Sequence, residues 1–467
     1  MPRSAAFLEA RRRGAAAFPI LAVDYVARGF SLGRGIYSPA IRETSLGQVT
    51  AVTEDGTGWS EIRYGSGIAK SSLEAVSWSV KVSDPKGELL DMLETYDPRG
   101  SAVRADWGAT GLVAEDWEPL ARGVLADWAR EDPFTALLCK TDDTVLRSPV
   151  PAGTFERTLW GSAAEPTIYG THLPLLMGIH DSWQISARGM VVATNIRYDK
   201  DQGYWWLGSI DQMIEIARVY ADGIPLGNVG WSATRGVFGQ HYLTFISFAE
   251  GYQPSKGVIV SFDCRAMDEN GLIAGSALTG APDQLRGIIN QYGGYRLPPL
   301  RGWGGDVIVI DAASWDAASE WFALHRIESA RAFGGEQNPE SVAEVVQSFL
   351  DAYLFARIAW TPLGKLAIGI IDPDDVEPTT AARLNLALHH SDDRVPFAPG
   401  DAREVYTHVK TAFMWSAAEQ KYMSEYQAHD VAALREKVVL PLENPWSQCR
   451  LTQDTPTNPA PPADPIP

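Results

Sequence analysis

Alternating apolar and polar positions recur along most of the chain and predict β-strands. The segment "EAVSWSVKVSD" (Glu74–Asp84) places Val76, Trp78, Val80 and Val82 on one face. This period of two is typical of a strand with one buried face. The runs "AVRADWGA", "PLARGVLADWARED" and "QHYLTFISFA" repeat it less strictly. The pattern therefore predicts a chain dominated by strands.

Short polar dipeptides between these runs predict tight hairpins. In "RVYADGIPLG", Asp222 and Gly223 separate a branched and aromatic run from an apolar one. A type I′ turn needs positive φ at both central residues, which Asp tolerates and Gly adopts freely. We interpret Asp222 and Gly223 as a structural turn rather than as part of a catalytic loop. Ile214–Tyr220 should then pair with Ile224–Leu226.

Strict alternation within Ile214–Tyr220 would place its even-numbered residues on one face and its odd-numbered residues on the other. Two further hairpins are predicted, one around Asp55-Gly56 and one around Asp199–Gly203.

Apolar residues at helical spacing interrupt the strands in a few places. "PKGELLDMLETYDPRG" predicts a short helix that ends at Asp97-Pro98, and Ala281–Gly293 predicts another. The longest predicted helix is Asn338–Trp360, with Asn338 as its cap and Pro339 in its first turn. An Ala- and Arg-rich helix is also expected over Ala5–Ala17, before Pro19.

These elements predict an α+β, mostly antiparallel β chain with several domains and a few inserted helices. The length of 467 residues suits about three domains. The predicted segments are an arm over 1–19, a β-barrel domain over 20–150, a hairpin-rich domain over 151–245, an α+β segment over 246–335, a second α+β domain over 336–450 and a Pro-rich tail over 451–467.

The net charge of −18 argues against a sequence-independent grip on nucleic acid or anionic lipid over the whole surface. The only short basic cluster is "EARRRGAAA" (Glu9–Ala17). Cys139, Cys264 and Cys449 lie far apart, so they predict reduced, mostly buried thiols rather than a disulfide framework. No apolar run is long enough to predict a transmembrane helix, and the N-terminus lacks a convincing cleavage site for a signal peptide.

Few residue groups suggest metal chemistry. Three groups contain residue types that can bind metals or exchange protons. They are "HHSDD" (His389–Asp393), the acidic loop Ile371–Pro378 and the neighbours His180 and Asp181. None has the spacing of a known metal motif, and we predict surface loops and ordinary hydrogen bonds instead. The sequence predicts no catalytic residue, no cofactor and no metal ligand.

Sixteen tryptophans raise the alternative of a carbohydrate-active enzyme, in which tryptophans stack on sugar rings and two carboxylates do the acid–base chemistry. Against this, Trp78, Trp128, Trp321 and Trp360 fall at core-like positions of amphipathic elements. No carboxylate pair can be selected from the sequence.

Several local patterns follow one another in an order that resembles the baseplate hub and tail-tip proteins of tailed bacteriophages. These patterns are "SWSVKVSDPKGELLDML", "PLARGVLADWAREDPFTALLCKTDDTVL", "EPTIYGTHLPL", "RVYADGIPL" and "SVAEVVQSFLDAYLFARIAWTPLGKLAI". They cover roughly residues 70 to 440. The chain is similar in this respect to the N-terminal part of the lambda tail-tip attachment protein.

The resemblance implies a non-enzymatic virion protein that is made in the host cytoplasm and placed at the tail tip. It implies a homotrimer with two tube-like β-barrel domains per chain, which contacts the tail tube, the distal tail protein, the tape measure and a central fibre. DNA would pass through an acidic lumen without specific binding. A distal tail protein or another baseplate ring component is an alternative, as are the carbohydrate-active enzyme and a non-viral binding module made of hairpins.

Overall fold

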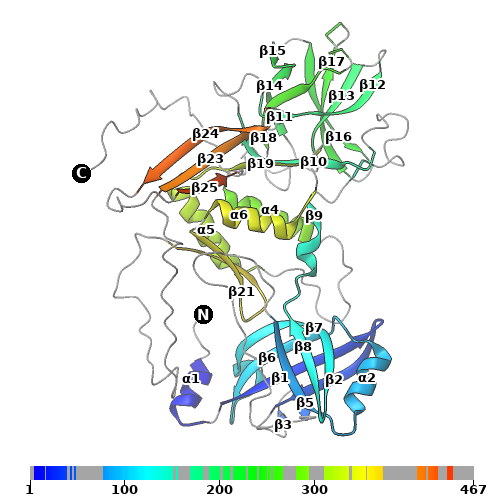
Figure 1. Cartoon of the computed structure of the whole chain (residues 1–467), viewed down its shortest axis with the longest axis vertical. Helices are drawn as coiled ribbons and strands as arrows, with labels where there is room; N and C mark the ends of the chain where they lie inside the picture. Colours follow the sequence, from blue (N-terminus) through cyan, green and yellow to red (C-terminus); the bar gives the residue numbers. More distant parts are fainter. Residues whose placement is uncertain are drawn as a thin grey trace, which may run out of the picture. The chain divides into compact units, whose positions relative to one another are not determined.

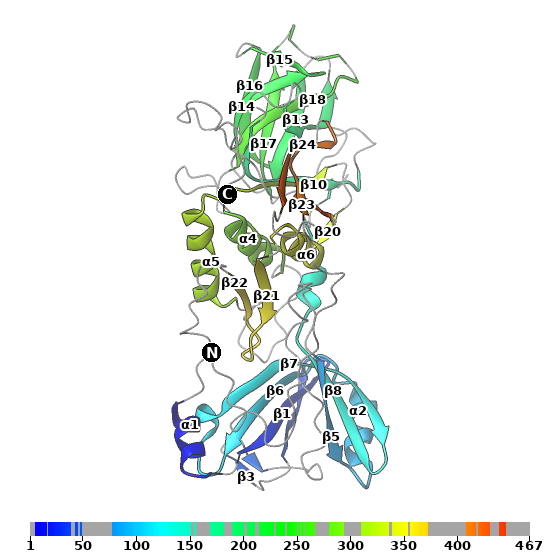
Figure 2. The same ribbon diagram turned by 60° about the vertical axis from the view of Figure 1, so that its left-hand side comes forward.

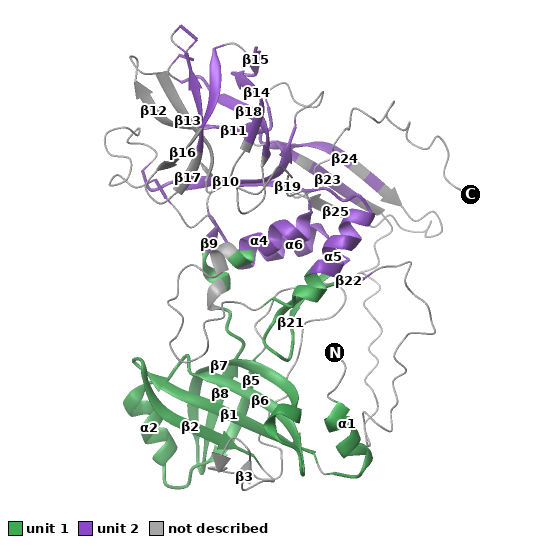
Figure 3. Ribbon diagram, turned by 180° about the vertical axis from the view of Figure 1, so that it is seen from behind, with its two compact units in different colours: residues 1–148, 289–315, 356–369 green, residues 149–288, 316–355, 370–467 purple. Residues whose placement is uncertain are grey.

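The computed structural model (Figure 1) describes residues 5–15, 17–38, 43–44, 47–48, 77–150, 154–155, 169–181, 189–199, 203–210, 214–227, 230–238, 241–249, 251–252, 254–255, 257–266, 280–293, 310–335, 339–353, 355–371, 408–416, 419–429 and 439–444. The chain forms two compact units (Figure 3). Unit 1 comprises residues 1–148, 289–315 and 356–369, and unit 2 comprises 149–288, 316–355 and 370–467. The first segment of unit 1 ends at residue 148, two residues before the predicted boundary at residue 150. The division into six consecutive segments stays a prediction.

The main sheet of unit 1 has six antiparallel strands in the order β2-β1-β6-β7-β8-β5. It curves into a half-barrel, and within the described residues β2 and β5 are its two edges. The strands are β1 (Ala17–Ala27), β2 (Phe30–Tyr37), β5 (Ser77–Ser83), β6 (Ala102–Ala109), β7 (Glu118–Glu131) and β8 (Phe134–Lys140).

Over Ser77–Ser83 the strand β5 confirms the predicted alternation, because Trp78, Val80 and Val82 are buried while the residues between them are more exposed. The predicted position of Val76 lies outside the described residues. In contrast, β1 is buried on both faces. Leu21 packs on one side, whereas Ile20 belongs to a cluster with Trp117 on the other. The connection between β6 and β7 supplies that cover, so the alternation of β1 is masked in the sequence.

Unit 1 also contains several shorter elements. They are α1 (Ala5–Arg12), β3 (Glu43–Thr44), β4 (Gly47–Gln48), α2 (Glu88–Tyr96), the 3-10 turns η2 (Ala114–Asp116) and η3 (Thr144–Arg147), and the hairpin of β21 (Ala356–Trp360) and β22 (Leu366–Ile370). The helix predicted before Asp97-Pro98 is confirmed as α2.

The helix expected over Ala5–Ala17 is shorter than predicted, and Pro19 lies inside a strand. Gly14 has a φ of 84° just beyond α1, and β1 begins at Ala17. Proline fits there because Pro19 is paired only with Trp107 of β6, whereas the β2 pairing begins at Leu21. A proline is tolerated where a strand needs no backbone donor on its second side.

Unit 2 contains one five-strand path, β15-β14-β18-β10-β19, to which β11 is added beside β18, and a four-stranded sheet in the order β12-β13-β17-β16. Their bounds are β10 (His172–His180), β11 (Val191–Val192), β12 (Thr194–Asp199), β13 (Gly203–Ile210), β14 (Ile214–Ala221), β15 (Ile224–Leu226), β16 (Trp231–Phe238), β17 (His241–Phe248), β18 (Val260–Ala266) and β19 (Ala330–Gly335). The hairpin predicted around Asp199–Gly203 is confirmed by the pairing of β12 with β13.

Smaller elements complete the chain. A two-stranded ladder pairs β9 (Pro149–Val150) with β20 (Glu340–Ser341), and β23 (His408–Ser416) lies between β24 (Lys421–His429) and the parallel β25 (Val439–Asn444). The helices are α4 (Ala281–Gly293), α5 (Ala312–Leu324) and α6 (Val342–Ala352). The bounds predicted for α4 are confirmed.

The long helix predicted over Asn338–Trp360 is wrong at both ends. Ser341 caps α6, since its hydroxyl accepts from the Glu344 backbone N–H while the Glu344 carboxylate accepts from Ser341. This reciprocal capping box fixes the start of the helix. The helix ends at Ala352, and the last residues of the predicted helix, Ala356–Trp360, form β21 instead and pair with β22.

The α+β, mostly antiparallel fold with several domains is therefore confirmed. Several earlier predictions fall outside the described residues: the hairpin at Asp55-Gly56, the cap Asn338, Cys449, His389–Asp393, the acidic loop beyond Ile371, and the C-terminal tail 451–467.

Candidate functional site

The hairpin tip at Asp222 and Gly223 is held by a second segment of the chain. Ala221 pairs with Ile224, so Asp222 and Gly223 form a two-residue turn, with φ of 48° and 82°. The backbone N–H of Asp222 donates to the carbonyl of Ile259 at 2.9 Å, and an Asp222 carboxylate oxygen accepts from the Ile259 N–H at 2.9 Å. The carboxylate thus ties the turn to the residue before β18.

The strict alternation expected within Ile214–Tyr220 is wrong because β14 carries a bulge. Its register against β18 shifts between Ile216 and Arg218. Beyond this shift, Val219 is fully buried in the same cluster that Ile216 packs against. The extra residue of a bulge reverses which positions face the core, and no residue type in the sequence marks it.

Asp84, the residue after β5, connects β5 and α2 to the hairpin of β7 and β8. Its two carboxylate oxygens accept from the backbone N–H groups of Leu89 at 3.2 Å and Leu90 at 3.0 Å, in the first turn of α2. The buried Thr135 hydroxyl donates to the same carboxylate at 3.0 Å, and the Asp84 N–H donates to the Pro133 carbonyl at 2.9 Å. One residue therefore holds β5, α2 and β8 together.

The electrostatics of Asp84 follow from these donors. Burial raises the pKa of its carboxyl, but the hydrogen bonds from Leu90, Leu89 and Thr135 oppose it and prevail, so the pKa lies below its ordinary value of 3.8. The residue before the helix, Gly87, has no side chain to cap it. Asp84 performs this task from outside the helix, where sequence reasoning does not look for a cap.

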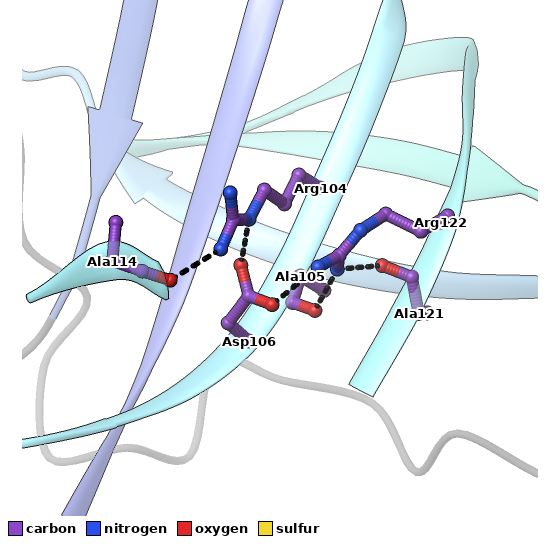
Figure 4. A network of polar contacts seen from close by, with 6 residues as sticks. All are labelled: Arg104, Ala105, Asp106, Ala114, Ala121 and Arg122. Carbon is purple, nitrogen blue, oxygen red and sulfur yellow. Dashed lines mark hydrogen bonds and ion pairs between the residues drawn. The ribbon is translucent and has the colours of Figure 1, made fainter. Parts of the chain in front are cut away.

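A second polar cluster of unit 1 surrounds Asp106, which is 1% exposed on β6 (Figure 4). Arg104 donates to one carboxylate oxygen, and Arg122 donates to the other at 2.6 Å. The guanidinium of Arg104 also donates to the Ala114 carbonyl at 2.8 Å, and that of Arg122 to the Ala105 carbonyl at 2.7 Å. These contacts bind β6 to β7 and to the turn that covers β1.

Asp263 is the corresponding buried carboxylate of unit 2, at 1% exposure. It accepts from the Tyr220 hydroxyl at 3.0 Å and from the Met190 N–H at 3.1 Å, and an Arg218 nitrogen lies 4.0 Å away. Asp106 and Asp263 are thus both engaged by donors that join neighbouring elements. Both carboxylates therefore hold neighbouring elements together.

Arg331 on β19 is a buried cation that anchors α6. Its guanidinium donates to both carboxylate oxygens of Glu340 at 2.7 Å and to the Ser348 hydroxyl, and it lies 4.9 Å from the centre of the Phe333 ring. Burial lowers the pKa of Arg331, against which the charge and hydrogen bonds of Glu340 act. One guanidinium nitrogen thus contacts both oxygens of Glu340 while another donates to Ser348, so Arg331 links β19 to β20 and α6.

His180 lies in the core, whereas its neighbour Asp181 is exposed. Burial lowers the pKa of His180 to about 4, although hydrogen bonds between its ring and the backbone of Met177 and Arg331 act in the opposite direction. The ring is therefore neutral at pH 7. Cys139 and Cys264 are buried free thiols, and burial raises the pKa of both.

The four tryptophans weighed as sugar platforms have different surroundings. Trp78 and Trp360 are buried. Trp128 is half-buried with the Arg99 guanidinium 4.5 Å from its ring centre, and Trp321 stacks on His325 at 3.9 Å. Two of the four rings are thus unavailable to a sugar, and the other two contact charged or titratable side chains.

Within the ranges that the structure describes, no helix is both long and apolar enough to cross a membrane. Among the same residues, no three His, Cys, Asp or Glu side chains gather into a group that could hold a metal ion.

Comparison with known proteins gives little overlap. No family model matches the chain. Over 81 residues it is 37% identical to a leucine–tRNA ligase of Ruegeria pomeroyi, a match that covers 17% of this chain and only 8% of that protein. Among solved structures, a chain from the virion of a native gene transfer agent particle aligns with a TM-score of 0.36 and 13% identity, over 62% of this chain and 70% of that one. A TM-score of this size does not establish a common fold.

Proposed function

We propose that the chain is a virion structural protein, a tail-tip or baseplate hub that continues a tail tube and joins it to distal components. In this role it acts as a homotrimer and has no catalytic site. Its partners are the tail tube, the distal tail protein, the tape measure and a central fibre. A distal tail protein or another baseplate ring component is the nearest alternative.

The observation that carries the proposal is the set of contacts made by Asp84. The two patterns that first suggested a hub, "SWSVKVSDPKGELLDML" and "PLARGVLADWAREDPFTALLCK", are separated in sequence. In the structure they pack as one body, because Asp84 of the first accepts from Thr135 of the second and donates to Pro133. The order of patterns in the sequence thus corresponds to a continuous half-barrel.

The arrangement of buried and half-buried charge supports the same function. Asp84, Asp106, Asp263 and Arg331 each cross-link two or more elements. A protein that must keep its shape inside a large assembly benefits from such links, because they hold the register of neighbouring strands. The net charge of −18 suits a channel through which DNA passes without adhering, since like charges repel the phosphates.

The mass and symmetry of the purified chain test this proposal. Light scattering and negative-stain images should show a threefold ring around an axial channel. A monomer with a cleft that holds two carboxylates roughly 5–9 Å apart would favour the carbohydrate-active alternative instead.

A further inference from the structure

The N-terminal helix presents the only basic cluster of the chain on the surface of unit 1. Phe7 is buried, and α1 packs against β6, so the helix is attached to the sheet. Arg11, Arg12 and Arg13 at its C-terminal end are all exposed. Arg13 is 77% exposed even though it pairs with Glu9, and Arg11 donates to the Ala15 carbonyl at 3.0 Å. These local contacts leave the charges accessible to a partner.

The helix α2 presents the opposite charge. Glu88, Asp91 and Glu94 follow one another at spacings of three residues and are all exposed, with the Glu88 side chain at 78%. The apolar residues Leu90 and Leu93 face the sheet and are buried. The helix therefore carries acidic groups on its outer side while its inner side is fixed in the core.

The two helices lie at opposite sides of the half-barrel. Figures 1 and 2, which differ by a rotation of 60°, both show α1 at one side of the six-stranded sheet and α2 at the other. They therefore do not pair within one copy. Complementary charges on opposite sides of one body suit head-to-tail association, in which each copy uses one side to contact the next.

We propose that the arginine end of α1 in one copy docks on the acidic side of α2 in a second copy. Copies with a net charge of −18 repel each other at long range, so a local patch of positive charge on one side would favour an interface between them. Arg11–Arg13 are the one such cluster in the sequence, and the facing patch is supplied by Glu88, Asp91 and Glu94. The idea rests on the proposed function only in expecting that the chain associates with itself.

The pairing is tested by reversing the charges of each helix in turn and then of both helices in the same chain. The triple variant Arg11→Glu, Arg12→Glu, Arg13→Glu should weaken association of the full chain roughly ten- to a hundredfold, because attractive contacts become repulsive. The triple variant Glu88→Lys, Asp91→Lys, Glu94→Lys should do the same. The variant that carries all six substitutions in one chain should recover association, because every α1–α2 contact between copies then regains a pair of opposite charges. Raised salt should weaken the wild-type complex.

A matched control reverses three other exposed basic residues by the same net charge: Arg147→Glu, Lys410→Glu and Lys421→Glu. This variant should keep the wild-type mass in light scattering. Circular dichroism checks that every variant is folded.

The possible failures are distinguishable. A wild-type chain that is monomeric at all concentrations overturns both the ring and the helix pairing. An oligomer whose mass is unchanged by both reversals, or whose loss is not rescued when both reversals are made in one chain, overturns the pairing alone. Binding of a DNA duplex that is lost in the arginine variant, with no change of mass, assigns the arginines to nucleic acid and also overturns it.

Discussion

Asp222 is a residue for which a catalytic interpretation and a turn interpretation both start from the same short sequence. Its backbone has positive φ, and its carboxylate accepts from the Ile259 N–H. The exposed carboxylate therefore holds the turn against the residue before β18. The sequence suggested the turn through Asp-Gly, but it contains no sign of the bond to Ile259, which lies 37 residues further along.

Replacing Gly223 with Val should destabilise the hairpin by about 1–2 kcal/mol, because a β-branched residue is strained at a φ of 82°. Gly227 offers a control in the same segment, since its Cβ would meet nothing within 4 Å and its φ is not positive. Urea unfolding should therefore separate Gly223→Val from Gly227→Val. Equal stability of the two variants would count against the turn.

His180 predicts a pH dependence of stability. Its folded pKa of about 4 lies below the ordinary 6.5, so the unfolded chain binds the proton first as pH falls. The stabilisation is complete above pH 6.5 and is lost progressively down to about pH 4. At about 1.4 kcal/mol per pKa unit, the loss is roughly 3 kcal/mol.

The measurement is urea unfolding at pH 7 and near pH 4.5. His180→Gln should lose less stability than the wild type between the two values, because it has no proton to gain. His172→Gln, a replacement on the same strand at a less buried position, should behave like the wild type. If the wild type and His180→Gln respond equally to acid, burial of a neutral His180 is not the cause.

At the scale of elements, Asp84 should matter more than its exposed surroundings suggest. Asp84→Ala removes the acceptor for the first turn of α2 and the partner of Thr135, and it should cost about 1–2 kcal/mol. Because the folded pKa of Asp84 is lowered, its contribution is present above pH 3.8 and lost as pH falls below it.

A double-mutant cycle separates the two contacts of Asp84. Thr135→Val leaves the helix cap intact and should cost less than Asp84→Ala, and Asp84→Asn, which keeps one acceptor oxygen, should lie between them. Coupling between positions 84 and 135 is measured by urea unfolding of the single and double variants. Additive effects would mean that the strand–helix segment and the hairpin are stabilised independently.

Elements with a strong local signal could be predicted from the sequence. The alternation of β5, the leucine spacing of α2 and the Asp-Gly turn were enough, because each depends on residues close in sequence. The end of α6 could not be predicted, since the apolar positions after Ala352 suit a helix and a strand equally well. Their pairing with β22 decides in favour of a strand.

The polar contacts between elements were beyond sequence reasoning. Asp106 and Arg122, or Asp263 and Tyr220, become partners only after the strands pair, and nothing in their spacing marks them. The bulge in β14 is a similar case, because Ala217 has no property that requires it. The helices and strands could therefore be predicted from residues close in sequence, whereas the buried polar contacts depend on the tertiary structure.

At the scale of the whole molecule, the chain combines antiparallel sheets and hairpins with buried charges that act as cross-links. Within the described residues, each buried carboxylate is engaged by donors from the backbone or from neighbouring side chains. This arrangement is suited to holding a shape in an assembly.

A cryo-EM reconstruction of the particle that contains this chain tests the central claim most directly. The hub proposal predicts three copies around the tail axis, with their half-barrels forming a ring that continues the tube and leaves a channel open for DNA. Density for the chain away from the axis, or a copy number that does not fit a closed ring, would contradict it.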